Sequence, residues 1–252
     1  MWEGGSTAFG RNDEYSDLDI AFLYKFGAHD EVWRVVDEAF AELGGVDFRW
    51  RDSHRLPPGW EKRMFRPRHA ESWMQVDVNI IPDIAKELYN QPERDGRIVV
   101  LFDRSGRLAR PPRWDEEKNR QRVGVALHQS LMRWEHQYGS FRKQLARGRT
   151  VDAFMAHFEV NVMSLVTVLN IRYRPSRWQF GLRYLKEELP PEVVKIVEQI
   201  CYVPSPAGLE ERFAQADLLL QDTVKELEEQ GTRRIDPFGF DIWRGALNTD
   251  KR

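Results

Sequence analysis

Near its N-terminus the sequence reads GGSTAFGRNDEYSDLDI over residues 4–20, and the end of this stretch opens a short apolar run, Leu18–Tyr24. The length of that run predicts a buried strand. Side chains alternate between the faces of a strand, so Asp17 and Asp19 would point the same way while their apolar neighbours face the core. Two carboxylates on one face repel each other unless a cation lies between them, and oxygen ligands suit magnesium. The pair therefore predicts a metal site.

The start of the same stretch has the composition of a phosphate-binding loop. Gly5 lets the backbone come close to a ligand, and Ser6 can donate hydrogen bonds from both its amide and its hydroxyl. Arg11 adds a positive charge. Because the loop comes just before the paired aspartates, we expect Gly5, Ser6 and Arg11 to bind the phosphates of a nucleotide over the metal.

A third carboxylate lies further along, in the sequence QVDVNI of residues 75–80. The valines and the isoleucine would form the buried face of a strand, with Asp77 on the other face. A lone aspartate in an apolar strand is expensive to bury unpaired, so it needs either a metal or one of the chain's many arginines beside it. A metal shared with Asp17 and Asp19 explains all three positions at once.

Around these motifs the pattern is mixed α and β as far as the prolines of residues 111–112, and helical beyond them. Short apolar or alternating runs predict further strands over residues 46–51, 74–81 and 97–102. Apolar residues at helical spacing predict helices over residues 32–43, 114–146, 151–173, 178–189, 192–202 and 209–230. We therefore predict an α+β fold, with an α/β domain built on a mixed sheet over residues 1–112 and an α-helical bundle over residues 113–252.

The bulk composition narrows the class of protein. A formal net charge of -2 lacks the positive excess of a nucleic-acid-binding protein, which disfavours a nucleic-acid partner. The single cysteine, Cys201, excludes an internal disulfide and a zinc cluster and fits a cytoplasmic protein. We find no apolar run that approaches the roughly 20 residues of a membrane span, so no membrane partner is expected.

The N-terminal motif resembles that of the DNA polymerase beta-type nucleotidyltransferase superfamily. The resemblance is to its small bacterial members, the antibiotic nucleotidyltransferases that adenylylate aminoglycosides or lincosamides. More loosely, residues 169–189 resemble part of the C-terminal bundle of the streptomycin/spectinomycin adenylyltransferases. The residues that carry the N-terminal resemblance are Gly5-Ser6, Gly10, Asp17-x-Asp19 and Asp77.

This resemblance implies a nucleotidyltransferase domain over residues 1–112 and a transfer of AMP from ATP to a hydroxyl of a small acceptor, such as one of these antibiotics. Two magnesium ions would be held by Asp17, Asp19 and Asp77. Asp77 would also take the proton from the acceptor hydroxyl.

The helical half would complete the site. Arg183 and Lys186 lie about one turn apart on the predicted helix and would face the nucleotide. Trp134 and Glu135, on the first helix of the bundle, are candidates for the acceptor pocket, where the acidic residue would suit a cationic acceptor. A tryptophan at helical spacing is also a common core residue, so a packing role for Trp134 stays open.

Two other functions stay open. One is adenylylation of a protein or RNA partner, as minimal nucleotidyltransferases in toxin–antitoxin pairs perform. Arg122 and His128, six residues apart on a predicted helix, have a spacing found in the helical ribonucleases that accompany such proteins. We favour the interpretation that Arg122 lies on a solvated face and that His128 is a helix residue at the edge of the bundle. The other is a non-enzymatic nucleotide-binding protein, against which the complete set of carboxylates argues. The sequence also leaves a homodimer open.

Overall fold

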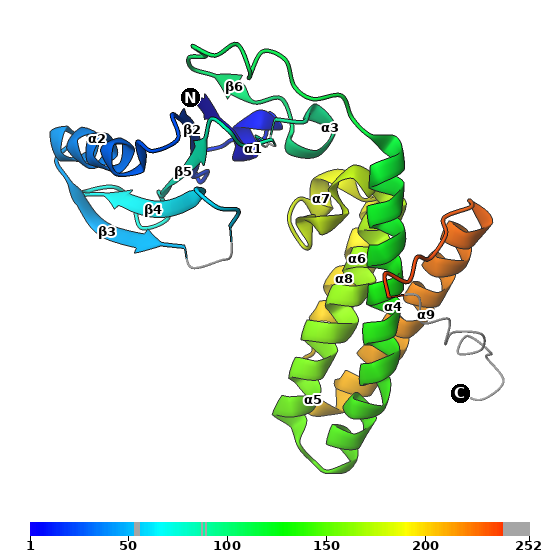
Figure 1. Ribbon diagram of the computed structural model, residues 1–252. Helices are drawn as coiled ribbons and strands as arrows, with labels where there is room; N and C mark the ends of the chain where they lie inside the picture. Colours follow the sequence, from blue (N-terminus) through cyan, green and yellow to red (C-terminus); the bar gives the residue numbers. More distant parts are fainter. Residues whose placement is uncertain (53–55, 87, 89, 239–252) are drawn as a thin grey trace. The chain divides into compact units, whose positions relative to one another are not determined.

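The computed structural model describes residues 1–52, 56–86, 88 and 90–238. The chain divides into two compact units, Met1–Trp114 and Asp115–Arg252. The first unit holds a β-sheet with helices around it, and the described part of the second unit is helical (Figure 1). The predicted α+β fold class is confirmed.

Within the described residues, the sheet of the first unit has six strands in the order β3-β4-β5-β2-β1-β6. β2 and β5 are parallel neighbours and the other pairs are antiparallel, so the sheet is mixed, as predicted. The strands are β1 (Trp2–Glu3), β2 (Leu18–Tyr24), β3 (Val46–Arg51), β4 (Glu61–Pro67), β5 (Val76–Pro82) and β6 (Val99–Val100). The helices of this unit are α1 (Gly5–Ala8), α2 (His29–Glu42) and α3 (Pro92–Asp95).

Two strands of this sheet have no pattern that predicts them. β1 is only two residues long. β4 has the sequence EKRMFRP, with charged residues on both of its faces. It lies between β3 and β5, which supply backbone partners on both sides, so its position in the sheet overrides its polar composition. In contrast, the predicted strand over residues 97–102 is reduced to the short strand β6 at the edge of the sheet.

Helix α2 covers one face of the sheet. Its residues Trp33, Val36 and Phe40 are buried in one cluster with residues of β4 and β5. The members from β5 are Val76, Val78 and Ile80, so the predicted buried face of this strand is confirmed. Since side chains alternate along a strand, Asp77 projects to the face opposite α2. Beside it, a second cluster covers part of that opposite face through Trp2, Ala21, Ile81, Leu88 and Leu108.

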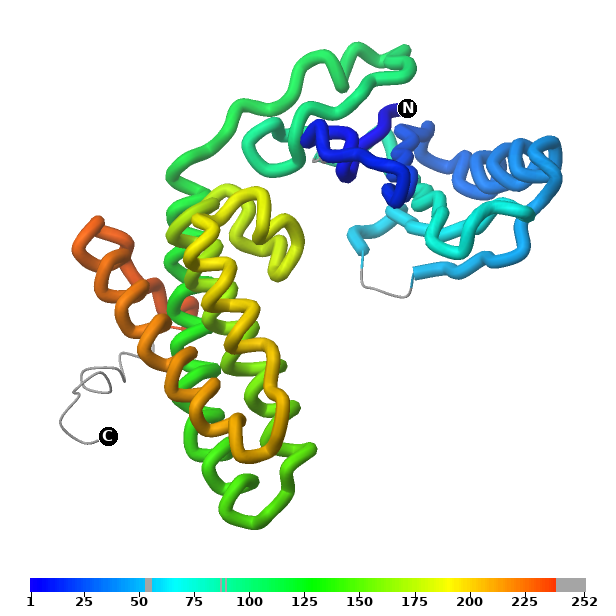
Figure 2. The backbone as a smooth tube through the Cα atoms, turned by 180° about the vertical axis from the view of Figure 1, so that it is seen from behind, coloured from blue at the N-terminus to red at the C-terminus, as the bar shows by residue number. Residues whose placement is uncertain are grey.

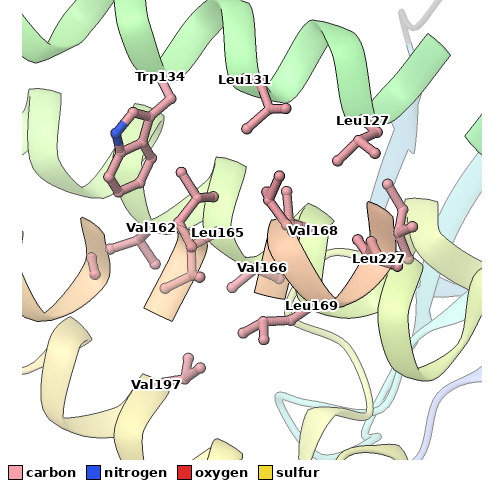
Figure 3. Close-up of a cluster of buried hydrophobic side chains, with 14 of the residues drawn as sticks. Leu127, Leu131, Trp134, Val162, Leu165, Val166, Val168, Leu169, Val197 and Leu227 are labelled. Atoms are coloured by element: carbon pink, nitrogen blue, oxygen red, sulfur yellow. The ribbon is translucent and has the colours of Figure 1, made fainter. Parts of the chain in front are cut away.

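The second unit is a helical bundle in which long helices lie side by side (Figure 2). Its first helix begins at Glu116 because the carboxylate of Asp115 accepts a hydrogen bond of 2.9 Å from the backbone N–H of Lys118. Apolar side chains from these helices form a common core (Figure 3). The helical segments are α4 (Glu116–Ala146), α5 (Thr150–Ala156), η1 (His157–Val162), α6 (Met163–Tyr173), η2 (Pro175–Phe180), α7 (Leu185–Glu188), α8 (Pro191–Cys201), η3 (Pro206–Gly208) and α9 (Leu209–Glu229).

One continuous helical stretch of the bundle corrects the sequence analysis. Thr150–Tyr173 is 24 residues long and, by length and composition alone, apolar enough to cross a membrane. More than half of its most apolar window is buried within the protein. Its last part, α6, contacts both α4 and α9. This is the position of a helix in the core of the bundle, and such a helix can have the same length and apolar composition as a membrane span.

The predicted helix over residues 178–189 is wrong. Pro175–Phe180 forms a 3-10 turn, and only Leu185–Glu188 is α-helical. Between them Gly181 has a φ of +57° and Tyr184 lies in the left-handed region, also with a φ of 57°. Both conformations interrupt a right-handed helix. Arg183 and Lys186 therefore do not share one helix.

The burial of His157 in the bundle predicts how the stability of the protein depends on pH. Its side chain is 1% exposed, and burial lowers the pKa of its imidazole, because the interior disfavours the charged form. The unfolded chain binds the proton at about pH 6.5, so the stabilisation is complete above that pH and is lost as the pH falls toward the lower pKa of the folded state. We expect the thermal midpoint to fall between about pH 7 and about pH 5.

Thermal unfolding followed by circular dichroism across this range measures the effect. His157→Gln should flatten the dependence on pH, whereas His136→Gln, at an exposed position of α4, should leave it unchanged. An undiminished slope in His157→Gln would show that other groups carry the dependence.

Candidate active site

The register of the sheet brings two of the predicted aspartates together. Asp19 of β2 and Asp77 of β5 are direct partners across the parallel pair, so their side chains lie on the same face of the sheet. Neighbouring strands of a sheet are about 4.8 Å apart. Asp77 is only 6% exposed. Asp17 lies one residue before β2 and is exposed. The structure therefore pairs Asp19 with Asp77 and leaves Asp17 at the entry to the strand.

The predicted loop with Gly5 and Ser6 forms the short helix α1 and lies directly against Asp19; the name phosphate loop is kept for this segment. Gly5 has a φ of +57°, and a Cβ atom at this position would lie 1.8 Å from Oδ2 of Asp19. The backbone N–H of Gly4 also donates a hydrogen bond of 2.9 Å to the carbonyl oxygen of Asp19. Only glycine combines this backbone conformation with such a close approach. The predicted phosphate loop and the predicted carboxylate are thus neighbours in space.

Two further features of this loop concern polar groups. The hydroxyl oxygen of Ser6 is buried and, in the part of the chain that the structure describes, has no hydrogen-bond partner. A buried hydroxyl without a partner is uncommon and suits a missing ligand or water. The backbone N–H of Arg11 donates to the carbonyl oxygen of Ser6, and its guanidinium lies 5.5 Å from the centre of the Phe9 ring.

The close approach at Gly5 gives a direct test of the loop. In Gly5→Ala the added methyl group must displace Asp19. If this site catalyses a reaction, we expect the kcat/KM of that reaction to fall by about 100-fold or more, because shifts of about 1 Å in an active site can have effects of this size. Gly44→Ala is the matched control. Gly44 also has a positive φ (+96°), but a Cβ there would meet nothing within 4 Å. It should destabilise the fold by about 1–2 kcal/mol and leave turnover intact. Equal activity of the two variants would contradict the proposed contact.

A lysine partners the buried aspartate. Nζ of Lys62 lies 2.5 Å from Oδ2 of Asp77, with the two side chains 23% and 9% exposed. Sequence reasoning considered a metal or an arginine as the partner and missed this lysine. The pairing neutralises a carboxylate that would be costly to bury alone.

The three carboxylates differ in how well they are placed to hold the expected magnesium ions. Among the residues that the structure describes, no group of three or more His, Cys, Asp or Glu side chains is placed to hold a metal ion. The donor type nevertheless suits magnesium, since Asp19 and Asp77 offer oxygen ligands side by side and Asp17 comes two residues earlier. The ammonium of Lys62 shows that a cation is favoured at Asp77. The carboxylates of Asp17, Asp19 and Asp77 are therefore ligands of the type that magnesium prefers, provided that the ammonium of Lys62 leaves Asp77.

In the second unit, Arg183 and Lys186 lie on separate elements, a turn and the short helix that follows it. Both side chains are exposed. The guanidinium of Arg183 lies 5.5 Å from the centre of the Tyr184 ring and 5.9 Å from that of Phe180. Lys186 belongs to the short helix α7.

Buried polar residues that sequence reasoning missed hold this turn in place. Arg174 donates to the carbonyl oxygens of Gly181 and Arg183, at 2.7 and 2.6 Å. Its Nε atom donates to the side chain of Asn170, and it forms an ion pair of 3.0 Å with Glu188. Polar residues at the end of an apolar helix carry no periodic signal, so only the structure shows that they fix the segment with Arg183 and Lys186.

The structure corrects the expectation for Trp134. Its side chain is 2% exposed and belongs to the core of the bundle (Figure 3). Its indole N–H donates a hydrogen bond of 3.1 Å to Asp217, and its ring stacks on Phe213 at 5.9 Å. A side chain in this position packs the bundle and has no open face for a substrate. Glu135 is half-buried on the same helix, and its role as an acceptor ligand stays a prediction.

His128, which together with Arg122 has the spacing found in helical ribonucleases, makes a contact within the bundle. His128 lies 3.8 Å from the carboxylate of Asp236, and its side chain is 15% exposed. This contact places His128 against the segment that follows α9, as a partner within the bundle.

No protein-family model matches the chain, and no curated protein matches its sequence. Among solved structures, the chain is similar to an aminoglycoside 6-adenyltransferase from Bacillus subtilis, with 12% identity and a TM-score of 0.40 over 91% of this chain and 90% of that one. It is also similar to a nucleotidyltransferase-like protein from Exiguobacterium sibiricum 255-15, with 14% identity and a TM-score of 0.36 over 81% of this chain and 77% of that one. The likeness is distant in sequence and loose in structure.

Proposed function

We propose that this protein is a metal-dependent nucleotidyltransferase that moves AMP from ATP to a hydroxyl of a small molecule. One observation carries the proposal: Asp19 and Asp77 are register partners, with the Gly5–Ser6 loop pressed against Asp19. This arrangement sets the carboxylates of two aspartates beside a loop whose buried Ser6 hydroxyl has no hydrogen-bond partner among the described residues. The proposal includes a cytoplasmic location, because the single cysteine rules out an internal disulfide.

Each residue of the site has a role in the proposed reaction. Asp17, Asp19 and Asp77 would hold two magnesium ions, whose charge offsets that of the triphosphate and of the transition state. The Gly5–Ser6 loop binds the phosphates, with the Ser6 hydroxyl as a donor. Asp77 accepts the proton of the acceptor hydroxyl, whose oxygen then attacks the α-phosphorus in line as pyrophosphate leaves.

In this proposal Arg11, which follows the phosphate loop, binds the triphosphate, and a contribution of Arg183 and Lys186 to ATP binding stays a prediction from the sequence. Within the second unit, Arg183 lies on the turn that Arg174 fixes and Lys186 lies in α7. A triphosphate carries several negative charges, and charged hydrogen bonds contribute about 1.5–3 kcal/mol each. Loss of Lys186 would therefore weaken ATP binding by about tenfold or more.

The order of the strands indicates from which side the acceptor comes. The phosphate loop lies on the β2 side of the carboxylates, and β4 and β3 lie on the other side of β5. Along one row across the sheet, Asp77 is followed by its partner Met64, and Met64 by its partner Trp50. Trp50 is 42% exposed. This aromatic side chain offers a flat surface on which a ring of the acceptor can stack.

We propose a multi-ring hydroxylated acceptor, such as an aminoglycoside or a lincosamide, with a hydroxyl at Asp77 and another ring toward Trp50. The experiment is transfer of label from α-labelled ATP to a panel of such antibiotics, with Asp19→Asn as the inactive control. Labelled product with the normal protein alone would support the proposal. Transfer to a protein or RNA in lysate would favour the toxin–antitoxin function instead, and failure to bind ATP with magnesium would refute the nucleotidyltransferase function.

A further inference from the structure

The ion pair between Lys62 and Asp77 lies on the face of the sheet that carries the side chains of Asp19 and Asp77, opposite the cluster that α2 covers. Lys62 is on β4, where its backbone partner on β5 is Asn79, two residues beyond Asp77. Residues two apart on a strand share a face, so Lys62, Asn79 and Asp77 all lie on the face opposite α2. The contact of 2.5 Å is therefore made inside the proposed site.

This contact conflicts with metal binding at the same carboxylate. Oδ2 of Asp77 already forms an ion pair with the ammonium of Lys62. A divalent cation on Asp77 would lie close to that positive charge, and like charges at such short separations repel each other strongly in a partly buried site. Lysine and metal therefore compete for one carboxylate.

The side chain of Lys62 can leave the contact. It is 23% exposed, and its four-carbon chain is flexible, so its ammonium can reach water without moving the backbone of β4. Asp77 has no such freedom, because it is 6% exposed in a strand that is paired on both sides.

We propose that Lys62 is an internal counter-ion that holds Asp77 in the metal-free protein and exchanges with magnesium when the metal binds. The inference rests on the proposed function in one respect, that Asp77 is a metal ligand. It assigns Lys62 as a positioning residue, which keeps the buried carboxylate paired and in place until the metal arrives. It also sets the metal affinity, because magnesium must displace an ammonium ion to bind.

The test uses Lys62→Met in the full chain, with magnesium alone as the ligand. In EDTA, the variant should have a lower thermal midpoint, because Asp77 is left buried and unpaired. With magnesium its midpoint should rise by more than that of the unmodified protein, and calorimetry should show about tenfold tighter magnesium binding. Lys62→Gln, which keeps a donor for Asp77, serves if Lys62→Met does not fold.

A neighbouring ion pair on the other face of β4 gives a matched control. Glu61 is 5% exposed and accepts from Nε of Arg63 at 2.6 Å. Arg63→Met should also destabilise the protein, but magnesium should not compensate for it. In the double variant Lys62→Met/Asp77→Asn the midpoint in EDTA should recover and the extra response to magnesium should disappear.

The outcomes separate this inference from the proposed function. Equal magnesium affinity in the unmodified protein and in Lys62→Met would overturn the exchange while leaving the enzyme's metal dependence intact. No magnesium binding in either protein would overturn both. A magnesium response in Arg63→Met as large as that in Lys62→Met would show a general effect of lost charge and would also overturn the exchange.

Discussion

Replacing Asp77 by asparagine should lower kcat by about 10²–10⁴-fold, the range expected when a general base is lost. Asparagine has nearly the same shape, so the strand pairing on both sides of β5 should persist. The variant loses the proton acceptor and one charge of the proposed metal site, and Lys62 loses its partner. Single-turnover transfer from labelled ATP measures the chemical step apart from product release.

Asp47→Asn is the matched control for this prediction. Asp47 lies on β3 of the same sheet, where its carboxylate accepts from Nε of Arg66 at 2.8 Å and is 41% exposed. Its kcat should be unchanged, since exposed pairs of this kind contribute little. Near-normal turnover in Asp77→Asn, with an unchanged circular dichroism spectrum, would remove Asp77 from the site.

Replacing Arg174 by methionine should destabilise the second unit by about 3–5 kcal/mol, the usual cost of breaking a buried ion pair. The side chains of Arg174 and Glu188 are 1% and 4% exposed. The change removes the donors to the carbonyl oxygens of Gly181 and Arg183. Arg177 also pairs with Glu188, at 3.2 Å, and should reduce the effect toward the lower end of the range.

Urea denaturation followed by circular dichroism measures this loss. Arg172→Met is the control, because Arg172 and Glu226 form an exposed pair of 3.0 Å with side chains 30% and 51% exposed. Its effect should be at most about 1 kcal/mol. Similar small losses in both variants would mean that the turn with Arg183 and Lys186 is held by other contacts.

The parts of the fold that the sequence predicts are those with a periodic apolar face. β2, β5 and α2 bury such faces against one another, and their positions follow from pattern alone. β4 could not be predicted, because its charges are satisfied by neighbours far away in the chain. The turn around Gly181 could not be predicted either, since its carbonyl groups depend on a buried arginine that the sequence does not distinguish from a surface one.

The candidate site divides in the same way. Asp19, Asp77 and the glycine loop form a motif whose order along the chain indicates a common site, and the register then makes the aspartates neighbours. Lys62 has no motif, because its role depends on which residue of β5 lies beside it. The spacing of Trp134 is compatible with either a substrate pocket or a core position. In the structure it lies in the core, where its indole N–H donates a hydrogen bond to Asp217.

The parallel pairing of β2 with β5 has a consequence for how the protein folds. The two strands are separated in the chain by α2, β3 and β4, so the segment between them must be ordered or looped before Asp19 can meet Asp77. Contacts of this long range slow folding, whereas α4 with α5 and α8 with α9 are in contact close along the chain. We therefore expect the bundle to form early and the carboxylate pair late. Newly made or partly unfolded chains would then pass through a state in which the bundle is native and Asp19 and Asp77 are not yet paired.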